Sequence, residues 1–177
     1  MKLHFVEQGS GPLVVLLHGF PEFWYSWRRQ LPALASAGFR AVAPDLRGFN
    51  DSPRPHAVAD YRLRLVIDDV AELVENLGAP CVLVGHDWGG LVAWYLAMSR
   101  PELVRKLAVL NIPHPVPFLR ELRGSISQKL RMSYQLLFQP PLLAELLMPM
   151  VLPRLLRGYA PEAVAEYRRA WSKPGAR

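Results

Sequence analysis

Short runs of consecutive apolar residues alternate with longer amphipathic segments through the first 113 residues of the chain. Continuous apolar runs are typical of strands buried on both faces of a parallel sheet. They occur at residues 13–17, 40–44, 82–84 and 107–110, and residues 3–7 are expected to add an antiparallel edge strand. The intervening segments place apolar residues at helical spacing, at residues 24–35, 61–77 and 88–98. The alternation predicts an α/β fold, with a mostly parallel sheet, flanking helices and three crossovers.

The pattern changes after the segment Asn111-Ile112-Pro113-His114-Pro115. Helical periodicity continues from there without further strands, punctuated by prolines, at residues 125–139, 142–156 and 161–171. We therefore expect two domains, a core at residues 1–114 and an all-helical cap, or lid, segment at residues 115–177. Because no later strand returns the chain to the sheet, the fold is expected to be truncated and the lid incomplete.

The amino-acid composition and net charge limit the class of protein to which the chain can belong. With 177 residues, 51% of them hydrophobic, the chain can bury a sizeable core. Its net charge of +6 is spread over amphipathic helices of the second half, which is typical of a solvated helix face and does not favour nucleic-acid binding. Cys81 stands inside an apolar run and is expected to fill space in the core. A signal region and a membrane span are both missing from the pattern, so we expect a cytoplasmic protein.

The segment Gly85-His86-Asp87-Trp88-Gly89-Gly90, directly after an apolar run, carries the clearest chemical signal. A small-x-nucleophile-x-small pattern between a strand and a helix is a nucleophile elbow, which lifts one side chain above the sheet edge. That side chain is Asp87, a carboxylate suited to displacement at a saturated carbon, with an alkyl-enzyme ester as the product. A helix N-cap is the alternative role for Asp87, although glycines on both sides argue against a simple cap.

A second loop, His18-Gly19-Phe20-Pro21, ends the run at residues 13–17. Its amides can face the same pocket as Asp87, so the backbone N–H groups of Phe20 and Trp88 are predicted to form an oxyanion hole. We expect His18 to brace the loop structurally, because a base attached there would lie on the wrong side of the ester. His86 is expected to be a packed neighbour.

Aromatic side chains are candidates for the substrate pocket. Tyr134 shares a helical face with Leu130 and Phe138, so its hydroxyl could polarise an epoxide oxygen, although a buried core tyrosine has the same spacing. We expect Trp24, Pro21 and Phe138 to contact substrate.

The segment Pro44-Asp45-Leu46-Arg47-Gly48 ends another apolar run and indicates a tight turn. We interpret it as loop architecture, with Asp45 and Arg47 close enough to pair.

A base and an acid are missing from the expected positions. In this fold the triad order is nucleophile, acid, histidine. The last histidine of the chain is His114, and no aspartate follows Asp87.

Together these segments resemble the soluble epoxide hydrolases of the α/β-hydrolase superfamily. The resemblance implies that Asp87 attacks an epoxide carbon while two lid tyrosines, the first matching Tyr134, hold the ring oxygen. A histidine paired with an acid would then activate water to release a vicinal diol, but in the family both lie beyond the matched part. This chain is therefore expected to be limited to alkylation. The matching segments are residues 18–22, 24–28, 44–48, 85–90, 111–115, 134–135 and 138–140.

Two other functions stay open. Haloalkane or haloacid dehalogenases share the aspartate elbow, and the Trp88 indole could donate to a departing halide. The chain could also be a catalytically incomplete fragment that acts through another chain, with self-association at an uncovered strand at residues 107–110. The expected ligand is a small apolar epoxide, with no cofactor and no metal.

Overall fold

The computed structural model describes residues 1–133 and 150–173. The chain divides into two compact units, Met1–Ile112 and Pro113–Arg177, which are described separately below.

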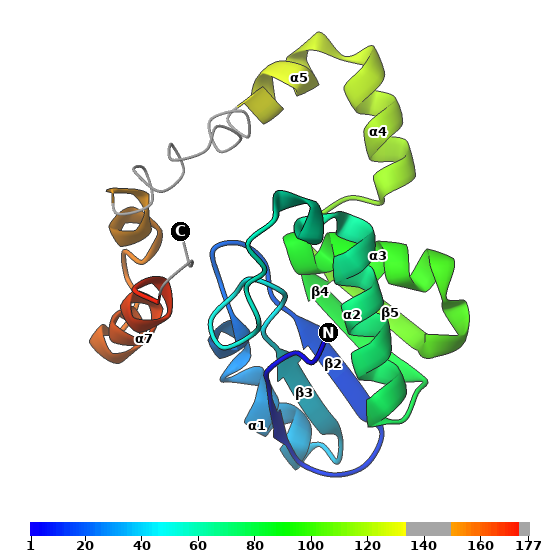
Figure 1. The fold of residues 1–177 in the computed structure, drawn as a ribbon, viewed down its shortest axis with the longest axis vertical. Coiled ribbons are helices and arrows are strands. Elements are labelled where there is room, and N and C mark those ends of the chain that lie inside the picture. The colour runs from blue at the N-terminus through cyan, green and yellow to red at the C-terminus, as the bar shows by residue number, and fades with distance from the viewer. Residues whose placement is uncertain (134–149, 174–177) are drawn as a thin grey trace. The chain divides into compact units, whose positions relative to one another are not determined.

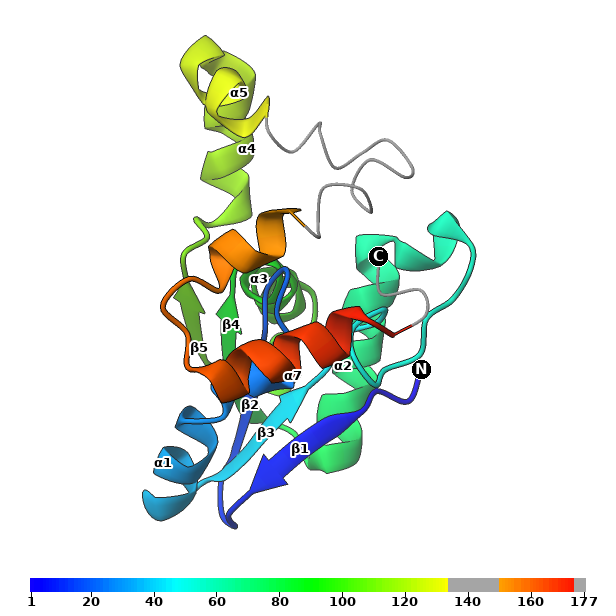
Figure 2. The ribbon, with the colours of Figure 1, turned by 90° about the vertical axis from the view of Figure 1, so that its left-hand side faces the viewer.

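The first unit is built on a five-stranded sheet with the order β1-β3-β2-β4-β5 (Figure 2). Strands β2 to β5 run parallel, and β1 pairs antiparallel with β3. The strands are β1 (Phe5–Gln8), β2 (Leu13–Leu17), β3 (Arg40–Pro44), β4 (Cys81–His86) and β5 (Val104–Leu110). The predicted α/β fold, with its mostly parallel sheet and antiparallel edge strand, is confirmed. The β5 strand forms the other edge of this sheet.

Three helices cover the sheet: α1 (Gln30–Ser36), α2 (Leu63–Leu77) and α3 (Trp88–Ser99). Short 3₁₀ turns lie at Trp24–Trp27, Val58–Tyr61 and Pro101–Leu103. The prediction of one helix over residues 24–35 is wrong, because a 3₁₀ turn and α1 share that segment. Pro32 explains the break: it has no N–H to donate four residues back, and its ring would clash with the Arg28 carbonyl in a continuous helix.

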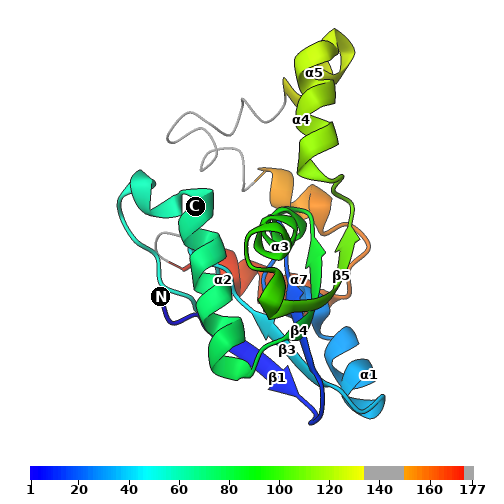
Figure 3. The ribbon, with the colours of Figure 1, turned by 90° about the vertical axis from the view of Figure 1, so that its right-hand side faces the viewer.

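Both faces of the sheet are buried, which explains the continuous apolar runs. On one face Val15, Leu17 and Val42 pack with apolar residues of α2 and α3. Side chains that alternate with these, such as Val14 and Leu16, pack with α1 on the other face. Figure 3 shows α2 and α3 side by side on their face of the sheet.

Cys81 is fully buried at the start of β4, and burial raises the pKa of its thiol to about 11. A thiol with so high a pKa stays protonated near neutral pH, which agrees with the expected space-filling role in the core.

The second unit is helical where it is described. It contains α4 (Pro115–Gly124), α5 (Ile126–Met132), a helical stretch at residues 150–155 and α7 (Pro161–Trp171) (Figure 1). The individual helices expected in the second half begin at residue 125, so α4 is not among them. Both prolines of α4, Pro115 and Pro117, fall in the first turn, where no intrahelical donor is needed, and the His114 ring accepts a hydrogen bond from the Val116 amide at 3.2 Å.

Within residues 1–133 and 150–173, no helix is long and apolar enough to cross a membrane.

Candidate active site

The turn between β4 and α3 places Asp87 in a backbone conformation that side chains rarely adopt, with φ +50° and ψ −119°. Such strain persists only where the surroundings impose it, and it clusters at functional sites. The glycines around the turn explain how it fits. A Cβ on Gly85 would lie 2.5 Å from the Gly89 carbonyl oxygen, and one on Gly89 would lie 2.4 Å from the His18 carbonyl oxygen. The geometry of a nucleophile elbow is thus present at Asp87.

The loop after β2 lies directly against this carboxylate. The Phe20 amide donates a hydrogen bond to Asp87 Oδ1 at 3.0 Å. A Cβ on Gly19 would lie 2.6 Å from Asp87 Cβ and 2.8 Å from Oδ1, so the close approach requires a glycine there. Of the two amides expected to form an oxyanion hole, that of Phe20 therefore contacts Asp87. The Trp88 amide opens α3 and has no partner in the described part of the chain.

The side chains of Phe20 and Trp88 line an apolar cavity of about 180 Å³ beside the elbow. Phe20 is 37% exposed and Trp88 is 52% exposed, so both rings are open to a ligand. The other lining residues are Leu46, Arg47, Phe49, Tyr61, Leu63, Val66 and Val92. A hydrophobic cavity next to a strained carboxylate can take the apolar part of a small molecule.

Trp24 and Pro21, two of the other expected substrate contacts, do not line this cavity. Trp24 packs against the core cluster on the α1 side, and its amide donates to Asp45 Oδ1 at 2.9 Å. Pro21 is half-buried and follows Phe20 through a cis peptide bond. Tyr134 and Phe138 lie outside the described residues.

His18 is buried and bridges two loops, as the sequence predicted. Its Nε2 accepts a hydrogen bond from the Leu46 amide at 2.9 Å, so its Nδ1 carries the proton and donates to the Gly19 carbonyl, also at 2.9 Å. Burial lowers the pKa of His18 from its ordinary value, which keeps the ring neutral. Both ring nitrogens are occupied, so His18 positions the loop beside Asp87 and is no base.

His86 has partners that sequence reasoning missed. Its Nδ1 lies 3.3 Å from Glu22 Oε2, and its Nε2 lies 3.2 Å from Asn111 Nδ2. Glu22 follows β2 and Asn111 follows β5, whereas His86 ends β4. The carboxyl ends of parallel strands meet at one edge of a sheet, and this rule could have grouped the three residues with Asp87.

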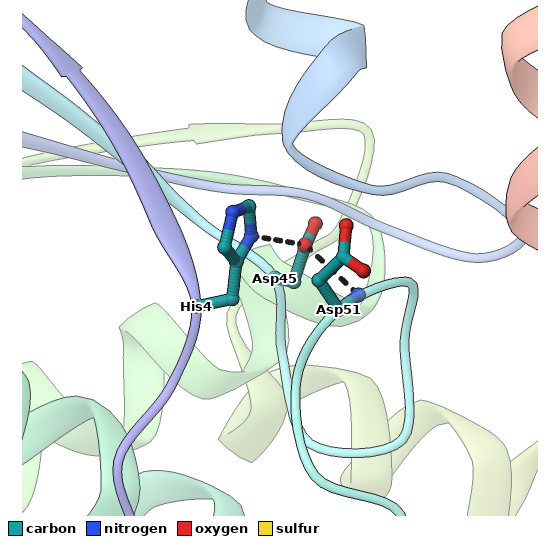
Figure 4. Close-up of side chains that lie close together, drawn as sticks. All are labelled: His4, Asp45 and Asp51. Carbon is teal, nitrogen blue, oxygen red and sulfur yellow. Dashed lines mark hydrogen bonds and ion pairs between the residues drawn. The ribbon is translucent and has the colours of Figure 1, made fainter.

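Asp45 anchors the loop after β3, but the expected pairing with Arg47 is wrong. The Asp45 carboxylate is fully buried, and its Oδ2 accepts hydrogen bonds from His4 Nδ1 at 2.7 Å and from the Asp51 amide at 3.4 Å (Figure 4). Asn50 Nδ2 donates to the same oxygen at 2.9 Å. The donors that contact Asp45 come close to it only in the folded chain, so spacing along the sequence did not identify them.

His4, Asp45 and Asp51 are the residues best placed to hold a metal ion in the described part of the chain. One ligand atom from each of His4, Asp45 and Asp51 lies within 4.8 Å of the others. Both Asp45 oxygens already accept hydrogen bonds from the protein, however. The cluster is therefore explained as a hydrogen-bonded anchor of the loop.

Arginines fix the segment between β3 and α2, which forms one wall of the cavity. Arg47 is buried and makes a bidentate pair with Asp69 of α2 at 2.7 and 2.8 Å. It also donates to the Asp60 carbonyl, and Arg54 donates to the Gly48 carbonyl. The guanidinium groups thus satisfy main-chain oxygens that no regular secondary structure would satisfy.

These features define an α/β-hydrolase: a mostly parallel sheet, a strained carboxylate directly after the inner strand β4, and a loop amide aimed at it. The family model described as "alpha/beta hydrolase fold" matches residues 12–147, and the chain belongs to this family.

Among curated proteins, "AB hydrolase superfamily protein YfhM" of Bacillus subtilis is 40% identical over 99% of this chain and 66% of its own length. "Epoxide hydrolase 4" of Homo sapiens is 45% identical over 80% of this chain and 40% of its own length. A crystal structure of an epoxide hydrolase from Bacillus megaterium with an inhibitor has a TM-score of 0.87 and 35% identity, covering 96% of this chain and 63% of that one. The chain thus spans two thirds or less of the length of each of these relatives.

Proposed function

We propose that this chain carries the alkylating half of an epoxide hydrolase, with Asp87 as the nucleophile. The observation that carries the proposal is the strained elbow at Asp87, whose Oδ1 accepts the Phe20 amide hydrogen at 3.0 Å. The names of the relatives support an epoxide as the substrate. The apolar cavity beside Phe20 and Trp88 supports a substrate with a hydrophobic arm.

In the first step, Asp87 Oδ2 forms a bond to an epoxide carbon while the ring C–O bond breaks. The electron pair of that bond stays on the ring oxygen, which takes a proton from the Tyr134 hydroxyl. A carboxylate needs no deprotonation near neutral pH, so this step requires no base. The product is an ester of Asp87.

In the second step, water adds to the ester carbonyl carbon, and the negative charge develops on Oδ1. The amides of Phe20 and Trp88 would stabilise that charge, because preorganised donors act where charge appears. Collapse of this intermediate breaks the bond between Asp87 Cγ and Oδ2; Oδ2 leaves on the substrate, takes the proton that water gave up and becomes one hydroxyl of a vicinal diol, while the water oxygen stays in the carboxylate. His18, buried and neutral with both nitrogens occupied, does not supply the base for water. We expect the ester to persist in the isolated chain.

Intact-mass spectrometry with styrene oxide tests this proposal. We expect an adduct of one substrate mass that peptide mapping places on Asp87, and no adduct with Asp87→Asn. Asp68→Asn is the matched control, since that side chain is 60% exposed on α2. Absence of the adduct in the unsubstituted chain, together with absence of diol, would sink the proposal.

The same experiment separates the proposed alternatives. Repeated turnover to diol would support the epoxide reaction but contradict the limit to alkylation. Chloride release from 1-chlorohexane, with no reaction of styrene oxide, would favour a dehalogenase.

We further propose that the isolated chain self-associates through β5. This strand ends the sheet, its outer side pairs with no strand of the described residues, and Leu110 is 44% exposed. Unpaired strand edges favour association. Light scattering after size-exclusion chromatography should give a mass above that of one chain, and a stable monomer at all concentrations would contradict the idea.

A further inference from the structure

A second hollow, of about 360 Å³, opens at the amino ends of the parallel strands. We call it the amino-end groove. Its apolar walls are Pro12, Leu13, Leu77, Pro80 and Val82, and the remaining lining residues are Gly11, Arg40, Gly78, Ala79 and Arg105. The β1–β2 and α2–β4 turns that form it lie at the lower end of the sheet in Figure 1. Asp87 lies at the opposite end of β4, about 20 Å away for a strand of this length, so the amino-end groove is distinct from the candidate active site.

Two guanidinium groups give the amino-end groove its charge, and they differ in their partners. Arg40 is fixed: it donates to Glu7 Oε2 through Nε at 2.9 Å and Nη2 at 2.7 Å, and to the Leu77 carbonyl through Nη1 at 3.2 Å. Arg105 has no hydrogen bond or ion pair within the described part of the chain. Of the two guanidinium groups, that of Arg105 is the one available to a ligand.

The sheet is irregular at Arg105. Cys81 is in register with Val104 and Val82 with Lys106, so Arg105 is the extra residue of a β-bulge. Bulges redirect a side chain from the direction that regular pairing would impose, and they recur beside binding sites. The bulge therefore explains how Arg105 of β5 comes to line the amino-end groove.

From this geometry we infer that the amino-end groove binds a small monocarboxylate with a short aromatic or alkyl body. A guanidinium presents paired N–H donors that match a carboxylate. The groove holds two guanidinium groups against the single carboxylate of Glu7, so its charge complements an anion. The leucine, valine and proline walls receive the hydrocarbon, and the volume is at the lower end of the range for small-molecule sites. A strongly hydrated inorganic anion would leave these walls without a partner.

Titration of the chain with 4-phenylbutyrate, followed by amide NMR shifts and calorimetry, tests the inference. We expect saturable binding below about 10 mM, with the largest shifts at Gly78, Ala79 and Val82. The alcohol 4-phenylbutanol, which lacks the carboxylate, should bind at least about tenfold more weakly.

Substitutions of Arg105 test whether its guanidinium binds the carboxylate of the ligand. Arg105→Gln should weaken 4-phenylbutyrate binding about tenfold or more, whereas Arg105→Lys should retain part of the affinity. Arg64→Gln, at a side chain 90% exposed on α2, is the matched control and should bind as the unsubstituted chain does. Because Arg105 is exposed and unpaired, its replacement should leave the fold intact, which circular dichroism checks.

Three results would overturn the inference: no saturable binding, equal binding by Arg105→Gln, or shifts confined to the surroundings of Phe20 and Trp88. Asp87→Asn should keep full affinity, so the outcome here is independent of the proposed epoxide chemistry.

Discussion

Replacement of Gly19 by alanine tests whether the contact between the loop after β2 and Asp87 governs reactivity. The added Cβ would lie 2.6 Å from Asp87 Cβ, which is short of the 3.4 Å where ordinary contact begins. Neither partner is a flexible chain end, so the loop must move by several tenths of an ångström or more. The hydrogen bond from the Phe20 amide to Asp87 Oδ1, now 3.0 Å, would lengthen or break.

The magnitude follows from these contacts. A hydrogen bond to a charged group contributes about 1.5–3 kcal/mol, which corresponds to about a 10- to 100-fold slower alkylation if the bond orients the carboxylate. Overpacking adds a cost of about 1–3 kcal/mol in the free energy of unfolding. Quenched-flow mass spectrometry with styrene oxide measures the first effect, and urea denaturation measures the second.

Gly124→Ala is the matched control, because nothing lies within 4 Å of the added Cβ at the end of α4. It should change neither quantity. If Gly19→Ala alkylated at the rate of the unsubstituted chain, the loop amide would not orient the nucleophile, and this reasoning would be refuted.

Three further predictions concern stability. Burial lowers the pKa of His18. Its contribution to the free energy of unfolding is therefore fully present above its unfolded pKa of about 6.5 and is lost as the pH falls below that value. His18→Gln should flatten this pH dependence in urea titrations between about pH 7 and about pH 5. Arg47→Met leaves the buried Asp69 carboxylate without its bidentate partner and should cost about 3–5 kcal/mol, whereas a similar cost in an Asp69→Leu background would contradict pairing as its cause. Asp45→Asn should cost about 2–4 kcal/mol, because it replaces one acceptor oxygen by an NH2 group that points a donor at donors; added zinc should not change the melting temperature of the unsubstituted chain, and a clear rise would contradict the hydrogen-bonded anchor.

The sheet could be predicted from the sequence because its strands are buried on both faces. The runs around Val15, Val42 and Leu83 are continuously apolar, short and separated by turn residues, which is the pattern of strands buried on both faces. The elbow could be predicted because its glycines are required by backbone contacts that any sequence with this turn must satisfy. Local constraints thus determine both features.

What could not be predicted depends on partners distant in the chain. Arg47 stands two residues from Asp45 but pairs with Asp69 of α2. Several other carboxylates were chemically suitable partners. Only the packing of helices on the sheet decides which of them meet. The missed helix α4 is a different case, since its position-specific tolerance of proline was readable from the sequence.

The segment between β3 and α2 owes its shape to arginine side chains that reach its own carbonyl groups. Of the two aromatic residues of this segment that line the cavity, Tyr61 joins the network, since its hydroxyl donates to the Pro55 carbonyl at 2.9 Å, whereas the Phe49 side chain has no polar group to contribute. A smaller side chain at Phe49 is therefore expected to enlarge the cavity while the hydrogen bonds that hold this segment are kept.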